Sequence, residues 1–235
     1  MKNFIKPLLA SALALSLMAS AQAADIDVSK LPHRSDDANA PVVYMTTQII
    51  PEAMLKIYET LGRTPTGNVA VKLSTGEAGN PHYLQPSLIK GVVDTVKGTI
   101  VECNTAYGGS RAETAMHMQV AKDHGFTEIA KVDIMDAEGS MEIPVEGGKF
   151  LKKNLVGTHL PNYDFMVVLT HFKGHAMGGF GGALKNISIG VASANGKGQI
   201  HTAGQSTEVD AWMRLGGFAS LNNPDHDAFS ESPIT

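Results

Sequence analysis

Cysteine is almost absent from this sequence: Cys103 is the only one among 235 residues. A chain with a single thiol has no internal disulfide, so its packed core has to supply its stability. It also lacks the four thiolates that hold an iron–sulfur cluster. The sequence therefore excludes a small disulfide-linked scaffold and a cluster bound by this chain alone.

An excess of positive charge is also lacking. The chain has 19 basic and 23 acidic residues, a net charge of −4, which does not suggest a nucleic-acid or anionic-membrane partner. No apolar run is long enough to span a bilayer, so no stable membrane anchor is expected. A hydrophobic content of 43% with 24 glycines is typical of a folded globular protein with one sizeable core.

The first 23 residues have the pattern of a secretory signal peptide. Lys2 and Lys6 supply its positive charge, and Leu8–Met18 is an apolar run without a charge. Ala21-Gln22-Ala23 is the small-x-small site that signal peptidase accepts. We therefore expect cleavage before Ala24 and export to the periplasm. The mature chain would carry 17 basic and 23 acidic residues, a net charge of −6.

Strand-like apolar runs alternate along the chain with segments of helical periodicity. This order predicts βαβ units, and hence an α/β fold with a largely parallel, Rossmann-like sheet covered by helices on both faces. Residues 24–40 are interpreted as a polar arm, 41–201 as the α/β domain and 202–235 as an irregular tail. The chain ends without a closing element, so we expect the domain to be incomplete at its C-terminus. The predicted strands are 42–47, 69–73, 99–102, 130–135 and 165–170, and the predicted helices are 51–61, 86–96 and 111–124.

Polar side chains of reactive type follow three of the predicted strands, in residues 74–77, 103–111 and 171–175. Ligands of open parallel sheets bind at the carboxyl ends of the strands, where loops and helix N-termini meet. The three segments therefore indicate a site at one edge of the sheet.

The segment 103–111 leads into the predicted helix 111–124. Arg111 and Thr114 would lie in its first turn as candidate anion ligands, with a solvated outer face as the equal alternative. A solvated position is the favoured interpretation for His117. Cys103 is expected to be a free, buried thiol rather than a nucleophile. The helix periodicity directs four apolar residues toward the sheet, namely Ala112, Ala115, Met116 and Val120.

The segment after the last predicted strand offers a second set of candidates. His171 and His175 are four residues apart, as in a zinc-binding helix, but Gly174 makes a helix unfavourable there, so hydrogen bonding to loop carbonyls is the alternative. Lys173 could hold a carboxylate or a phosphate.

A glycine-rich stretch, 178–182, comes next and leads to Lys185 and Asn186. It lacks the Walker pattern, because no Ser or Thr follows the lysine. Its glycines allow either close approach of a ligand or a tight turn.

The stretch from His171 to Asn186, continued by Ile189-Gly190, Gly196-Lys197 and His201, resembles the hallmark of the domain of unknown function 362 family. Another part of the chain is similar to the family's second motif: Glu102-Cys103-Asn104, Tyr107, Arg111, Thr114 and His117. The resemblance covers about residues 69–201 and implies an α/β fold with little settled biochemistry.

Members of this family often carry a cysteine-rich iron–sulfur insert after the position matching His201. Residues 202–235 contain no cysteine, so the resemblance implies no iron–sulfur cluster within this chain and an iron–sulfur protein as a candidate partner. Relatives also continue with further α/β elements, which agrees with a C-terminally truncated member.

Two functions are favoured by these residues. The first is an exported protein that binds a small anionic molecule or a divalent metal at the strand ends; whether it is also an enzyme stays open. The second is a non-catalytic accessory module of an iron–sulfur or redox partner. For the first, the candidate catalytic residues are His171, Lys173 and His175, the ligand-binding residues are Asn104, Tyr107, Arg111, Thr114, Lys185 and Asn186, and the metal ligands are His171, His175 and His201.

Overall fold

The computed structural model describes residues 27–30, 35–175 and 179–211. The chain divides into two compact units, Met1–Ile49 and Ile50–Thr235. The predicted signal peptide, 1–23, lies outside the described residues, as does the part of the predicted tail from residue 212 onward. No helix in the described part of the chain has both the length and the apolar character needed to cross a membrane.

In the first unit, a short 3-10 helix η1 (Val28–Lys30) precedes extended chain. The strand predicted for 42–47 is wrong: these residues form no strand and pair with none of the described strands, and Val42 and Val43 are 72% and 86% exposed. Their β-branched side chains favour extended backbone, but a strand also needs a neighbour whose backbone groups and side chains complete it.

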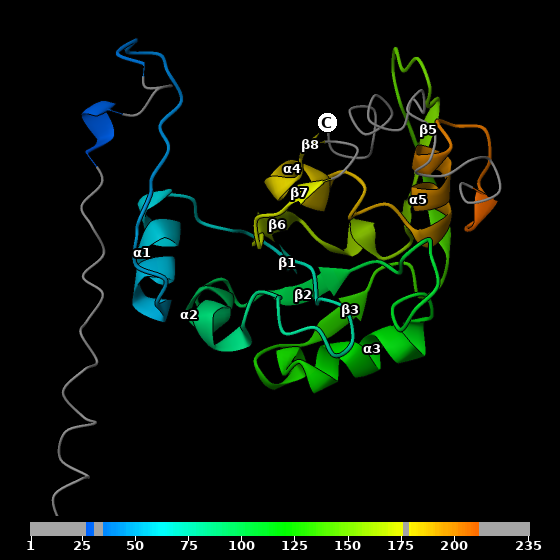
Figure 1. Ribbon diagram of the computed structural model, residues 1–235, viewed down its shortest axis with the longest axis horizontal. Helices are drawn as coiled ribbons and strands as arrows, with labels where there is room; N and C mark the ends of the chain where they lie inside the picture. The colour runs from blue at the N-terminus through cyan, green and yellow to red at the C-terminus, as the bar shows by residue number, and fades with distance from the viewer. Residues whose placement is uncertain (1–26, 31–34, 176–178, 212–235) are drawn as a thin grey trace, which may run out of the picture. The chain divides into compact units, whose positions relative to one another are not determined.

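The second unit is built on a four-stranded parallel sheet with the order β3-β2-β1-β6 (Figure 1). This confirms the predicted α/β fold with a largely parallel sheet. Its strands match four of the predicted apolar runs, because strands buried on both faces are nearly continuous in hydrophobic residues. They are β1 (Val69–Lys72), β2 (Thr99–Glu102), β3 (Val132–Ile134) and β6 (Phe165–Val168).

Five α-helices accompany the sheet in the described residues, with α2 and α3 on one side and α4 and α5 on the other (Figure 1). Helices α1 and α2 each begin with a proline, whose fixed φ suits the first helical position. The helices are α1 (Pro51–Thr60), α2 (Pro86–Val96), α3 (Thr114–Asp123), α4 (Gly182–Ile187) and α5 (Ala194–His201), with 3-10 turns η2 (Phe126–Glu128) and η3 (Leu160–Asn162).

Two antiparallel hairpins complete the unit, and neither was among the predicted elements. One joins β4 (Ser140–Pro144) to β5 (Lys153–Gly157), and the smaller joins β7 (Gly174–His175) to β8 (Gly179–Phe180). The run that forms β4 alternates between exposed and half-buried residues, so it lacks the continuous apolar pattern of the central strands.

Each face of the sheet has its own apolar core, because successive strand side chains point to opposite sides. Val69, Val71 and Ile100 pack with α1 and α2, whose Tyr58 and Ile89 are buried there. On the other face lies a second cluster, which consists of Ala70, Val101, Cys103, Met135, Val156 and Val191.

Helix α5 packs closely against β5. Gly196 lies in its first turn, and a Cβ at this position would lie 2.0 Å from the Leu155 carbonyl oxygen. The same carbonyl accepts a hydrogen bond from the Ser193 backbone N–H at 3.0 Å. The absence of a side chain at Gly196 therefore allows the helix to lie directly on the hairpin.

We predict that Gly196→Ala lowers the free energy of unfolding by roughly 2 kcal/mol, because the added methyl group forces α5 away from β5. The loss should occur although alanine favours a helix over glycine by up to about 1 kcal/mol. Urea denaturation of the two proteins measures it. The control is Gly108→Ala, where a Cβ meets nothing within 4 Å; equal stability of the two variants would contradict the close packing.

Candidate ligand-binding site

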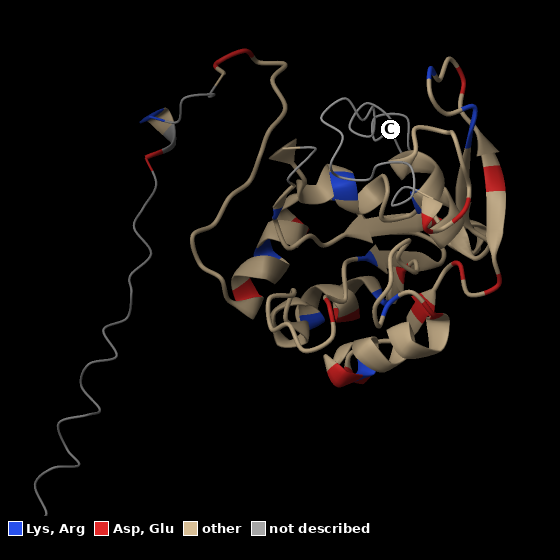
Figure 2. Ribbon diagram, turned by 45° about the vertical axis from the view of Figure 1, so that its right-hand side comes forward, with Lys and Arg blue, Asp and Glu red and all other residues tan. Residues whose placement is uncertain are grey.

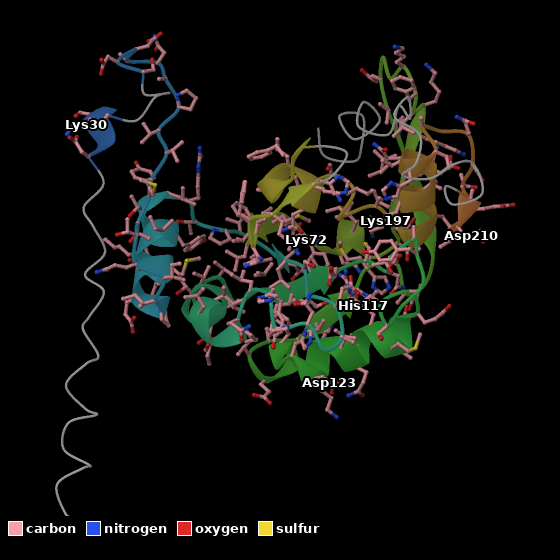
Figure 3. All side chains as sticks on the ribbon, viewed as in Figure 1. Lys30, Lys72, His117, Asp123, Lys197 and Asp210 are labelled. Carbon is pink, nitrogen blue, oxygen red and sulfur yellow. The ribbon has the colours of Figure 1, made fainter. Side chains whose placement is uncertain are left out.

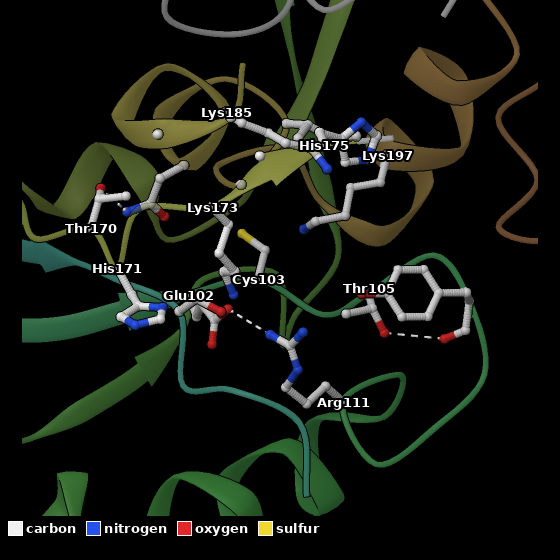
Figure 4. A pocket seen from close by; sticks show the side chains of 18 of the residues that line it. Glu102, Cys103, Thr105, Arg111, Thr170, His171, Lys173, His175, Lys185 and Lys197 are labelled. Atoms are coloured by element: carbon white, nitrogen blue, oxygen red, sulfur yellow. Dashed lines mark hydrogen bonds and ion pairs between the residues drawn. The ribbon is translucent and has the colours of Figure 1, made fainter. Parts of the chain in front are cut away.

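A cavity of about 640 Å³ opens at the carboxyl ends of β1, β2 and β6 (Figure 4). Each of the three predicted polar segments contributes to its lining. The first residues of these segments, Ser74, Cys103 and His171, all line the cavity. Its size is in the usual range for small-molecule sites. The lining comprises Ser74, Glu102, Cys103, Thr105, Tyr107, Arg111, Thr170, His171, Lys173, Gly174, His175, Gly181, Gly182, Lys185, Asn186, Ile189, Gly190, Lys197 and His201.

Positive charge gathers in this cavity. Four of the lining residues are lysine or arginine, and Glu102 is the one carboxylate in the described lining. Elsewhere along the described chain, basic and acidic residues are interspersed (Figure 2). The four cationic side chains come from three different parts of the fold: Arg111 from the loop before α3, Lys173 from the segment after β6, and Lys185 and Lys197 from α4 and α5.

Glu102, the last residue of β2, is the centre of a buried ionic network. Its Oε1 accepts a hydrogen bond from Arg111 Nη1 at 2.8 Å, and its Oε2 lies 2.9 Å from His117 Nε2. Thr75 donates to Oε2 from its backbone N–H at 3.0 Å and from its hydroxyl at 2.6 Å. Burial by itself would raise the pKa of Glu102, but Arg111, His117 and Lys72 hold it well below the usual range.

Arg111 is a member of this network rather than a free anion ligand. Helix α3 begins at Thr114, so the prediction that Arg111 lies in its first turn is wrong. The Arg111 side chain is buried between Glu102 and Glu77 and pairs with both carboxylates. Burial opposes its charge, yet the two carboxylates raise its pKa. Its Nε is buried without a partner in the described structure.

The predicted orientation of α3 is wrong in part. Val120 is buried as expected, but His117 is completely buried as well, whereas Ala115 and Met116, which were expected to face the sheet, are exposed. The ring of His117, which is labelled in Figure 3, lies 3.1 Å from Thr75 Oγ1 and 3.2 Å from Asn104 Oδ1, in addition to its contact with Glu102. These three polar contacts compensate for the desolvation of the imidazole, which a pattern based on hydrophobicity alone does not register.

Two further predicted ligand residues have structural partners. Asn104 Nδ2 donates to Thr114 Oγ1 at 2.9 Å, and the Asn104 backbone N–H donates to Asp136 at 2.8 Å. Neither Asn104 nor Thr114 lines the cavity. They fix the start of α3 next to the Glu102 network. Tyr107 does line the cavity, and its hydroxyl donates to Glu77 at 3.4 Å.

Asn186 holds α4 to the strand ends through a lysine that sequence reasoning missed. Lys72, the last residue of β1 and labelled in Figure 3, is 1% exposed. Its Nζ donates to Asn186 Oδ1 at 2.8 Å and to the Leu73 carbonyl at 2.7 Å. Burial lowers the pKa of Lys72 to about 8, although Glu102 opposes this shift. Asn186 Nδ2 in turn donates to Thr170 at 2.9 Å. The sequence contained one signal for this residue: a lysine at the end of an apolar strand.

The glycine-rich stretch allows the chain to approach itself. A Cβ at Gly181 would lie 2.4 Å from the Lys173 carbonyl oxygen, and Gly182 has a φ of +54°. These glycines therefore connect β8 to α4 in a tight turn, with Lys173, His175 and Lys185 on the cavity wall.

The predicted metal ligands His171, His175 and His201 all line the cavity. Among the described residues, no group of three or more His, Cys, Asp or Glu side chains is arranged to hold a metal ion. The geometry therefore lends the metal hypothesis no support, and metal binding stays a prediction.

Cys103 is a free, buried thiol, as predicted. Its Sγ donates to the Val191 carbonyl at 3.4 Å, and burial raises its pKa to about 12. A thiol that keeps its proton is a poor nucleophile.

The sheet and this cavity define the class: an α/β protein with a cationic cavity at the carboxyl ends of parallel strands. Comparison with family models then identifies the family. The chain belongs to the family described as Domain of unknown function (DUF362), whose model matches residues 69–231. The resemblance noted from the His171–Asn186 segment is thereby confirmed. A search of curated proteins found no match to this chain.

We predict that Glu102→Gln lowers the free energy of unfolding at pH 7 by roughly 3 kcal/mol, because Arg111 loses a buried counter-charge. Since the folded pKa of Glu102 is depressed, its contribution is present above its ordinary pKa of 4.5 and is lost as the pH falls through the lower folded value. Urea denaturation at several pH values between 7 and 3 measures this difference in the free energy of unfolding. The difference should be constant above the ordinary pKa of 4.5 and should become smaller below it.

The control for this experiment is Glu59→Gln, which removes a carboxylate from an exposed position of α1. It should change stability by less than about 0.5 kcal/mol. Similar small effects of both substitutions would contradict the role of the Glu102 network.

We predict that Cys103 reacts with Ellman's reagent at pH 8 at least about 100-fold more slowly in the native protein than in denaturant, because the buried thiol stays protonated. Absorbance at the wavelength of the released thiolate follows the reaction. Rapid labelling without denaturant would show that the thiol is accessible and ionised.

Proposed function

We propose that this protein binds a small anionic molecule in the cavity at the strand ends. The observation that carries the proposal is the excess of positive charge in the lining: three lysines, Lys173, Lys185 and Lys197, line the cavity in addition to Arg111 and one carboxylate, Glu102. Glu102 accepts hydrogen bonds from Arg111 and Thr75, and Arg111 also pairs with Glu77, so the excess comes from the lysines.

Lys173 offers the most direct contact for such a ligand. Its side chain is exposed in the cavity and makes no hydrogen bond or ion pair with any described residue. Lys197 uses one of its three donors on the Ala192 carbonyl at 2.6 Å, which leaves two for a ligand. Ammonium groups in a partly enclosed cavity attract carboxylate and phosphate groups strongly, because water screens them less there.

The histidines add proton-transfer capacity to this proposal. His171 and His175 stand on either side of Lys173 in sequence, and both line the cavity. Imidazole is the side chain that most often transfers protons in enzyme sites, so either ring is placed to act on a bound anion. The buried, protonated Cys103 offers no nucleophile, so the site favours binding or proton transfer over covalent catalysis. We further propose, from the signal-peptide pattern of residues 1–23, that the ligand is met in the periplasm.

We predict that Lys173→Met weakens the binding of inorganic phosphate or citrate by about 10-fold, because each charge-assisted hydrogen bond contributes roughly 1.5 kcal/mol or more. Isothermal titration calorimetry at low ionic strength, with thermal melting to confirm folding, measures the change.

The matched control is Lys122→Met, which removes the same charge from the exposed face of α3. It should leave the dissociation constant within about two-fold of the wild type, as expected for a screened, distant charge. If the two variants bind equally well, or if the wild type binds neither anion, the cavity is not an anion site.

A further inference from the structure

The two carboxylates that pair with Arg111 differ in burial. Arg111 Nη1 donates to Glu102 at 2.8 Å, and Nη2 donates to Glu77. The Glu102 side chain is 6% exposed, whereas that of Glu77 is 46% exposed. Separating a buried carboxylate from its cation is costly, but a half-exposed ion pair is only weakly favoured over hydration of its members. Glu102 is therefore the permanent partner of Arg111, and Glu77 is an exchangeable one.

The edge of the Arg111 guanidinium that binds Glu77 has one unused donor. Nη2 and Nε lie along the same edge of an arginine side chain, where together they bind both oxygens of a carboxylate. Glu77 Oε1 accepts the bond from Nη2, while Nε is buried without a partner among the described residues. Leaving a buried donor unpaired is unfavourable. Glu77 thus uses only half of a site that suits a carboxylate.

A third donor is directed at the same position. The Tyr107 hydroxyl donates to Glu77 Oε1 at 3.4 Å, and Tyr107 is 40% exposed. The loop that carries Tyr107 and Arg111 is closed by a backbone hydrogen bond of 2.9 Å from the Thr105 N–H to the Arg111 carbonyl. Both side chains line the cavity, and Figure 4 shows Arg111 there with its bond to Glu102. The donors that hold Glu77 therefore belong to the cavity wall.

We propose that Glu77 occupies the carboxylate subsite of this cavity and that the carboxylate of a ligand displaces it. This inference rests on the proposed anion-binding function, and it specifies a carboxylic acid as the ligand and Glu77 as the residue that competes with it. The ligand carboxylate accepts hydrogen bonds from Arg111 Nη2 and Nε and from the Tyr107 hydroxyl, while Glu77 turns to water.

The exchange is balanced in charge. Arg111 keeps two carboxylate partners throughout, so the buried Glu102 retains its counter-charge. The ligand makes one hydrogen bond more than Glu77 does, because its second oxygen accepts from Nε. Glu77, which is already half exposed, is released to solvent at little cost.

Titration calorimetry with citrate tests the displacement in two variants of Glu77. Glu77→Gln removes the competing charge, and Glu77→Asp keeps the charge on a side chain that is one methylene shorter and reaches Arg111 less well. We expect Glu77→Gln to bind citrate about 10-fold more tightly than the wild type and Glu77→Asp at least about 3-fold more tightly, because the ligand no longer has to replace a full charge-assisted hydrogen bond.

The matched control is Glu59→Gln, which removes an exposed carboxylate from α1. It should leave the dissociation constant of citrate within about two-fold of the wild type, as expected for a distant, screened charge.

A third variant, Arg111→Lys, assigns the effect to the arginine. Lysine keeps the positive charge beside Glu102 but lacks the planar pair of donors. We expect Arg111→Lys to weaken citrate binding by about 10-fold and to abolish the gain from Glu77→Asp when the two substitutions are combined. Thermal melting checks that each variant folds, and the two Glu77 variants decide the question by themselves where Arg111→Lys does not fold.

The outcomes separate this inference from the function on which it rests. If Glu77→Asp binds citrate no more tightly than the wild type, or if its gain persists in the Arg111→Lys background, displacement of Glu77 is wrong while the anion site stands. Wild-type protein that binds inorganic phosphate but not citrate would overturn the carboxylate subsite alone. If it binds neither anion, the proposed function fails as well.

Discussion

The buried carboxylate of Glu102 is the interaction on which the site depends. A carboxylate that is 5% exposed is stable only when cations and hydrogen-bond donors surround it. Arg111 and Thr75 meet this requirement as donors, and His117 contacts the same carboxylate. They come from a loop after β1, a loop before α3 and the buried face of α3, so one charge at the end of β2 determines how three segments are held.

A second buried charge, that of Lys72, holds the segments that form the other wall of the cavity. Lys72 ends β1, and its contact with Asn186 joins residues 114 positions apart in the sequence. Because Asn186 also donates to Thr170 after β6, α4 is tied to two adjacent strand ends. Lys185 precedes Asn186 in this helix, so the contacts of Asn186 also fix the backbone from which the Lys185 side chain extends to the cavity. The position of Lys185 in the cavity wall thus depends on the contacts of Asn186 with the strand ends.

The central strands and the first two helices could be predicted because each is specified by a local pattern. Residues such as Val69, Val71 and Ile100 form apolar runs that only a buried strand satisfies, and α2 presents Ile89, Val92 and Val96 on one side. The orientation of α3 could not be predicted in this way. Its most buried side chain is His117, and only the distant Glu102, Thr75 and Asn104 make that burial favourable. The prediction of a strand at 42–47 is wrong for the converse reason. Its residues favour extended backbone, but none of the described strands pairs with them.

The sequence by itself determined the fold class, the family, the edge of the sheet at which the polar segments meet, and the free thiol of Cys103. These depend on periodicity, residue type and short-range order, all of which are local properties. The tertiary structure decided which of those polar residues face the cavity. Lys173, Lys185 and His171 line it, whereas Asn104 and Thr114 are bonded to one another and Arg111 is held by two carboxylates. The reason is that the burial of a charge depends on partners far away in the chain, and only the folded protein brings them within hydrogen-bonding distance.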